Sequence, residues 1–118
     1  MKLKAIILAL SLTPLISSAD AMTFVCGQEF IQVFDNNGLI DEVRVNDKPT
    51  KIVIASHKVN ENGNVDTYLM YGFKGNQTVT QLFNSGDTHR TTAQKFIFQM
   101  NGSPENPGEP VTQPILCK

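Results

Sequence analysis

Two cysteines, Cys26 and Cys117, constrain this chain most, because they are its only cysteines and lie near its two ends. In an oxidising compartment such a pair predicts a disulfide, whereas in a reducing one it would suggest catalysis or metal binding. Two sulfurs so far apart in sequence make a poor zinc site, so we expect no metal. A disulfide between them requires the two ends of the folded domain to lie side by side.

The N-terminus predicts which compartment applies. A positively charged start and an apolar run over residues 5–16 are followed by small residues that end at Ala21, as in a secretory signal peptide. We therefore expect residues 1–21 to be removed and residues 22–118 to form a single β domain that is periplasmic or secreted. The apolar run is too short to remain in a membrane as a helix, so we expect no membrane insertion.

The charge of the chain excludes two classes of partner. The formal net charge is −1 at pH 7, and loss of the leader leaves the rest mildly negative. Lysine and arginine are not concentrated in any segment, whereas nucleic-acid binding needs a basic footprint. Attraction to an anionic membrane surface needs a similar basic cluster. We expect neither nucleic acid nor membrane as a partner.

The remainder of the sequence is typical of β structure. Short runs rich in apolar, β-branched and aromatic residues alternate with turns rich in Asn, Asp and Gly, a pattern that predicts antiparallel strands. We expect a small up-and-down antiparallel barrel of about eight strands or a β-sandwich, and the joined ends favour the barrel. The predicted strands cover residues 24–25, 30–34, 43–45, 52–55, 65–73 and 78–83, with turns at 35–38 and 46–49, and a last strand places Phe96, Phe98 and Met100 on one face.

The C-terminal segment, residues 103–118, has a different composition. Four prolines between residues 103 and 114 predict an extended stretch without strand partners. Cys117 at its far end indicates that this stretch is strapped back across the domain to Cys26.

No set of residues in this sequence predicts catalysis. His57 and His89 are the only histidines, and neither has a partner at a recognisable metal or catalytic spacing, so we interpret both as solvated surface residues. Asp41 and Glu42 are adjacent in a strand, so their side chains point to opposite faces and do not form a glycosidase pair. We therefore expect a protein that is not an enzyme and that needs no cofactor.

The segment 68–79 carries a family resemblance. Its aromatic strand runs into a Lys74-Gly75 turn and then into a strand rich in Thr and Val. This arrangement is similar to a signature of bacterial periplasmic and membrane-bound inhibitors of C-type lysozyme. The aromatic-x-Cys start at Cys26, the Ala-Ser pair at Ser56 and the cysteine near the C-terminus also resemble that family, whose fold is an eight-stranded antiparallel barrel.

The resemblance implies how such a protein would act. A loop enters the cleft of the hydrolase and presents a cation and a hydroxyl group to its carboxylates, which here would be Lys74 and Ser56. This sequence departs from the family pattern directly after Ser56, where His57 stands in place of glycine. The partner-binding set that we expect is therefore Ser56, His57, Tyr68, Lys74 and Gly75.

Two alternatives to an inhibitor of host lysozyme stay open at the level of sequence. The protein could be a periplasmic immunity protein that blocks a secreted wall-degrading effector. It could instead be a carbohydrate- or receptor-binding subunit, in which exposed Tyr68 and Tyr71 stack on sugars. A homodimer is compatible with either role.

Overall fold

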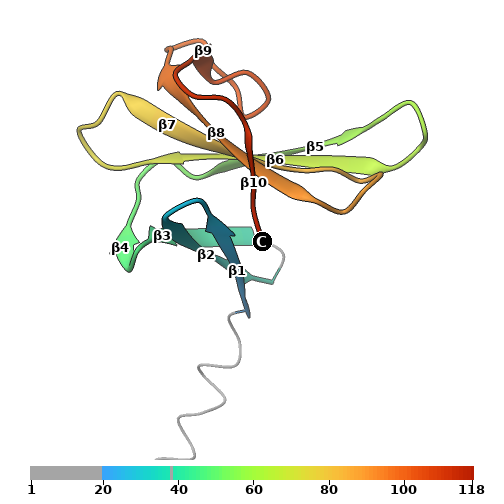
Figure 1. The fold of residues 1–118 in the computed structure, drawn as a ribbon, viewed down its shortest axis with the longest axis horizontal. Helices are drawn as coiled ribbons and strands as arrows, with labels where there is room; N and C mark the ends of the chain where they lie inside the picture. The colour runs from blue at the N-terminus through green and yellow to red at the C-terminus, as the bar shows by residue number, and fades with distance from the viewer. Residues whose placement is uncertain (1–19, 38) are drawn as a thin grey trace, which may run out of the picture.

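In a computed structural model, which describes residues 20–37 and 39–118, the chain forms two antiparallel sheets (Figure 1). The all-β prediction is confirmed, and the two sheets stack without closing into one barrel. Those residues contain no helix that could span a membrane. In order along the sheets, the four-stranded sheet holds β1 (Asp20–Cys26), β2 (Glu29–Asn36), β3 (Leu39–Val45) and β4 (Lys48–Pro49), and the six-stranded sheet holds β10 (Ile115–Leu116), β8 (Thr91–Phe98), β7 (Thr78–Asn84), β6 (Val65–Gly72) and β5 (Ile54–Val59), with β9 (Gly108–Pro110) also paired to β8.

The predicted signal peptide lies outside the described residues except for its last two positions. Asp20 and Ala21 begin β1, where they pair with Asp35 and Phe34 of β2. Cleavage after Ala21 would therefore shorten β1 by two residues and leave five of its pairs intact.

Two boundaries differ from the sequence prediction. The turn predicted at 46–49 is confined to Asn46 and Asp47, both at positive φ, as a two-residue hairpin requires. Lys48 and Pro49 follow as β4. The run 52–55 is not a strand at its start, because Ile52 and Val53 lie in the connection between β4 of one sheet and β5 of the other. These two residues cross from one sheet to the other, and β5 begins only at Ile54.

The main core lies between the two sheets. Side chains alternate along each strand, so that one face of each sheet is apolar and turned toward the other sheet. The buried members of this core are Cys26, Ile31, Val33, Val43, Val45, Leu69, Tyr71, Leu82, Ala93 and Cys117.

The proline-rich tail forms a third layer, which corrects the prediction that it lacks strand partners. Its strands β9 and β10 both pair with the free edge of β8, and Figure 1 shows β9 on the side of the six-stranded sheet away from the four-stranded one. Gln81 of β7 donates hydrogen bonds to the carbonyls of Pro104 and Glu105. Proline lacks an N–H but keeps its carbonyl, so prolines can lie at a sheet edge and still accept hydrogen bonds.

The tail covers a second, smaller core on the outer face of the six-stranded sheet. Met70, Val79 and Phe96 are its buried members, and Pro107 of the tail is fully buried as well. The last predicted strand ends at Phe98, so Met100 lies beyond it and is 98% exposed. The prediction that Met100 shares a strand face with Phe96 and Phe98 is therefore wrong for Met100.

The disulfide prediction is confirmed. Cys26 and Cys117 are bonded, with their Cα atoms 4.3 Å apart. Val25 and Lys118 exchange two backbone hydrogen bonds, and the Cys117 N–H donates to the Thr91 carbonyl. The C-terminus therefore runs from β8 of one sheet to β1 of the other and ties them together. A disulfide of this kind agrees with an oxidising, exported compartment.

At one end of the six-stranded sheet, two loops are joined by side-chain hydrogen bonds. Asn64 Nδ2 donates to Asp87 Oδ1 at 2.7 Å, and Asn62 Nδ2 donates to Asp87 Oδ2 at 3.2 Å. Asp66 accepts from the backbone N–H of Gly86. The hydrogen bond from Asn64 holds the pKa of Asp87 below its usual range, with smaller contributions from Asn60 and Asn62 and against some desolvation.

We expect Asn64→Ala to raise the pKa of Asp87 toward its ordinary value. Because the native pKa is lowered, the stability that this carboxylate contributes is present above its unfolded pKa and is lost as pH falls through the folded pKa. An NMR titration of the Asp87 carboxyl carbon measures the shift directly. Asn62→Ala is the matched control and should change the pKa less, and an unchanged titration in Asn64→Ala would contradict the assignment.

Candidate functional site

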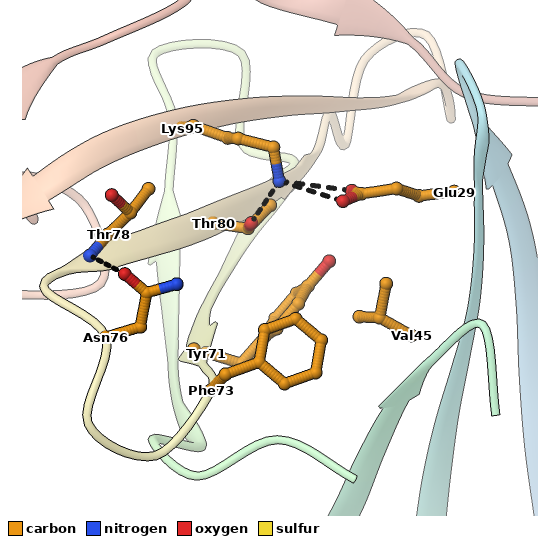
Figure 2. Close-up of a pocket in the computed structure, with 9 residues that line it drawn as sticks. Glu29, Val45, Tyr71, Phe73, Asn76, Thr78, Thr80 and Lys95 are labelled. Atoms are coloured by element: carbon orange, nitrogen blue, oxygen red, sulfur yellow. Dashed lines mark hydrogen bonds and ion pairs between the residues drawn. The ribbon is translucent and has the colours of Figure 1, made fainter. Parts of the chain in front are cut away.

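A polar pocket lies between the two sheets at one end of the main core. Its volume is about 270 Å³, and Figure 2 shows side chains from both sheets converging on it. Lys95 of β8 places Nζ 3.2 and 3.1 Å from the two carboxylate oxygens of Glu29 in β2, and 3.2 Å from Thr80 Oγ1. The ion pair joins the two sheets, and both partners remain partly exposed, so its contribution to stability is modest.

Tyr71 lines the same pocket and carries an unsatisfied polar group. Its side chain is 1% exposed, and its hydroxyl has no hydrogen-bond partner within residues 20–37 and 39–118. Burial, reinforced by the nearby Glu29 carboxylate, raises the pKa of this hydroxyl, so it stays protonated. This burial also corrects the expectation that Tyr71 is an exposed aromatic able to stack on a sugar.

We expect Tyr71→Phe to stabilise the protein by about 1 kcal/mol, because it removes a buried polar group without a partner and keeps the packing of the ring. Denaturant unfolding measures the difference. Tyr68→Phe is the control, since Tyr68 is only half-buried, and it should change stability little. A loss of stability in Tyr71→Phe would show that the hydroxyl is hydrogen-bonded in solution.

The turn between β6 and β7 forms the mouth of this pocket. Gly75 has φ +81°, which glycine adopts without strain. The Asn76 N–H donates to the Phe73 carbonyl at 3.1 Å, and the Asn76 side chain accepts from the Thr78 N–H at 3.2 Å. Phe73 and Asn76 line the pocket. Lys74 is exposed, and its side chain has no ion pair or hydrogen bond among the described residues.

Ser56 and Tyr68 lie elsewhere. They are directly opposite each other in β5 and β6, on the outer face of the six-stranded sheet that also carries Met70. The Tyr68 ring contacts the ring of Phe83 with centroids 4.8 Å apart. Lys74 lies six positions after Tyr68 and beyond the end of β6 at Gly72, which is at most about 20 Å of extended chain. Ser56 in the edge strand β5 and Lys74 in the β6–β7 turn therefore lie on different parts of the six-stranded sheet.

His57 faces the opposite side of β5 from Ser56. It lies across from Thr67, with His57 Nδ1 and Thr67 Oγ1 3.0 Å apart. It is exposed, and so is His89, but both histidines line a single large cleft between the sheets. From the sequence, His57 and His89 were interpreted as two solvated surface residues, with nothing to indicate that they share a cleft.

The sequence analysis missed the pair of Glu29 and Lys95. The two residues are 66 positions apart, and neither belongs to a motif, so no signal in the sequence could have joined them. The arrangement offers a polar, nearly neutral pocket rather than a nucleophile with its base. Among the described residues, no group of three or more His, Cys, Asp and Glu could hold a metal ion.

Comparison of the chain with protein-family models, with curated proteins and with solved structures returns no match.

Proposed function

We propose that this is an exported, periplasmic or secreted protein that binds and inhibits a peptidoglycan-cleaving enzyme, a lysozyme or another muramidase. The hairpin tip of Phe73, Lys74, Gly75 and Asn76 enters the active-site cleft of the target. The observation that carries the proposal is the exposed, unpartnered Lys74 at the tip of a tight, glycine-containing turn. Lys74 can meet an anionic partner without first breaking a bond within the described part of the chain.

The chemistry of the target supplies the complement. A muramidase cleft carries two carboxyl groups, of which one is ionised during the reaction. An ammonium group placed against that carboxylate in a water-excluded cleft makes a charge-assisted hydrogen bond that is stronger than an exposed one. The resemblance of residues 68–79 to lysozyme inhibitors supports the same site. Because Ser56 lies far along the sheet, the additional hydrogen-bonding group in this proposal is the side-chain amide of Asn76.

The experiment is a binding and inhibition assay against a panel of C-type lysozymes and bacterial wall hydrolases. Lys74→Ala should weaken binding to the inhibited enzyme by about 2–5 kcal/mol, the range for truncating one partner of a buried charge pair. Lys74→Glu should weaken it further, because two like charges would then meet. Lys48→Ala is the control: Lys48 is also exposed and lies directly after a tight turn, but it belongs to the other sheet.

The panel also separates the proposed roles. Inhibition of animal C-type lysozymes would favour defence against a host, and inhibition restricted to a bacterial muramidase would favour an immunity protein. If Lys74→Glu inhibits as well as the unchanged protein, the hairpin is not the binding site. If no hydrolase is inhibited, the inhibitor proposal fails and the carbohydrate- or receptor-binding alternative takes its place.

A further inference from the structure

The polar pocket beside the β6–β7 hairpin contains a buried hydrogen-bond donor that the described part of the chain does not satisfy. Tyr71 is 1% exposed and lines the pocket, and its hydroxyl has no hydrogen-bond partner within residues 20–37 and 39–118. Burial and the nearby Glu29 carboxylate raise the pKa of this hydroxyl, against a smaller opposing effect of Thr80, so it keeps its proton. A buried donor costs stability unless an acceptor reaches it. The pocket therefore favours a ligand that offers Tyr71 an acceptor.

A second free donor comes from the hairpin itself. Asn76 Oδ1 accepts the hydrogen bond from the Thr78 N–H, and this bond fixes which end of the side-chain amide is the nitrogen. Asn76 Nδ2 has no hydrogen-bond partner among the described residues. Figure 2 shows this nitrogen and the Tyr71 hydroxyl both directed into the pocket. Two donors, one from β6 and one from the turn that follows it, thus converge on one space.

The charged side chains that line the pocket are already paired with each other. Within residues 20–37 and 39–118 these are Glu29 and Lys95, which form the ion pair between the sheets. A carboxylate has about four acceptor positions, and Lys95 contacts each Glu29 oxygen once, so Glu29 can still accept from a ligand. A charged group on the ligand would meet one opposite and one like charge at nearly the same place. The pair therefore favours an uncharged ligand that donates to Glu29.

The size of the pocket and its apolar walls restrict the ligand further. Val45 is buried and Phe73 is 36% exposed, and both line the pocket. The volume of about 270 Å³ lies just below the range for drug-sized ligands, about 300–1,000 Å³, so one small ring fits better than a chain. A pyranose ring carries hydroxyl groups that both donate and accept, and its C–H face can pack on apolar side chains.

We propose that this pocket binds one neutral hexopyranose unit, whose hydroxyl groups accept hydrogen bonds from Tyr71 and Asn76 and donate one to Glu29. Tyr71 takes part through its hydroxyl and not by stacking of its ring. The inference goes beyond the proposed inhibition of a hydrolase. Phe73 and Asn76 belong to both sites, whereas Lys74 does not line the sugar pocket and Tyr71 is buried away from the hairpin surface.

The test is a ¹⁵N–¹H titration of the full chain at pH 7 with glucose, galactose and mannose, each compared with its uronate. At least one neutral sugar should cause saturable shifts in the amides of residues 72, 73, 76, 78 and 80 and leave those of residues 55–59 in place. The uronate of that sugar should bind at least fivefold more weakly. If none of the three sugars gives saturable shifts, or if the shifts are confined to residues outside the pocket, the proposal is overturned. Uronate binding as tight as that of the neutral sugar would overturn the uncharged ligand.

Two tyrosine variants separate binding from structure. Tyr71→Phe should weaken binding of the sugar about fivefold, the effect of one net hydrogen bond, without a loss of stability. Tyr68→Phe is the matched control, because it makes the same change at a half-buried tyrosine outside the pocket, and it should bind within twofold of the unchanged protein. Unchanged affinity in Tyr71→Phe would contradict the role of the buried hydroxyl.

A charge variant tests the reason for an uncharged ligand. Glu29→Gln leaves Lys95 without its carboxylate partner, so it should narrow the preference for the neutral sugar over the uronate, and an unchanged preference would contradict the charge argument. The two proposals can also fail separately. Lys74→Ala should bind the sugar as the unchanged protein does, and Tyr71→Phe should inhibit the hydrolase as the unchanged protein does.

Discussion

The double variant Cys26→Ser/Cys117→Ser is expected to lose about 4–5 kcal/mol of unfolding free energy, the chain-entropy value for a closed loop of this length. The two cysteines are separated by 91 positions, so the bond restricts nearly the whole unfolded domain. Domains of about 100 residues have only about 5–15 kcal/mol in total. The variant should therefore unfold at much lower denaturant concentration.

Guanidinium unfolding of the oxidised protein and the double variant measures this loss. Hydrogen exchange adds a local readout, because the N–H groups of Val25, Cys117 and Lys118 donate the bonds that hold the C-terminus to both sheets. These three amides should lose protection before the centre of β7 does. If the double variant lost less than about 1 kcal/mol of unfolding free energy and these amides kept their protection, strand pairing alone would hold the C-terminal segment in place.

Phe96→Ala is expected to cost about 3–5 kcal/mol, the usual range for truncating a buried aromatic side chain. Phe96 is 7% exposed and lies in the small outer core with Met70 and Val79. Its backbone pairs with Pro110 of β9. The substitution therefore removes packing under the tail as well as in the sheet.

The neighbouring Ile97→Ala is the control, because Ile97 is 45% exposed and its side chain points the other way. It should change stability by about 0.5 kcal/mol or less, as surface substitutions usually do. Limited proteolysis separates local from global effects: Phe96→Ala should become sensitive within residues 99–107, and Ile97→Ala should not. Equal sensitivity of the two variants would mean that the tail is not packed on Phe96.

The fold class could be predicted because its signals are local. Alternation of apolar and polar residues identifies strands such as β3 and β7, and the Asn46-Asp47 turn has residues that tolerate positive φ. The disulfide followed from composition and the predicted leader. The number of sheets could not be predicted, because stacking depends on where the chain leaves a sheet, and the crossing at Ile52 and Val53 has the same composition as a strand.

The tail was mispredicted for a related reason. Proline content predicts extended backbone, but it does not show that Pro104 offers its carbonyl to Gln81. In the candidate site, the Lys74-Gly75 turn could be predicted, because a turn is determined by residues that are neighbours in the sequence. The Glu29–Lys95 pair and the shared cleft of His57 and His89 arise only when distant strands stack. Ser56 and Lys74 were joined by a resemblance and not by strand register, which places Ser56 opposite Tyr68, six positions before Lys74.

The bond between Cys26 and Cys117 has a consequence for how the protein responds to proteolysis. It turns residues 26–117 into a covalent ring, which contains the exposed loops at 60–64 and 73–77 as well as the tail. Loop tips are the usual sites of nicking. One cut at any of them opens the ring but leaves both pieces in a single molecule, held at high effective concentration by the intact bond. The pieces can therefore stay paired as neighbouring strands, and only a second cut can release a fragment.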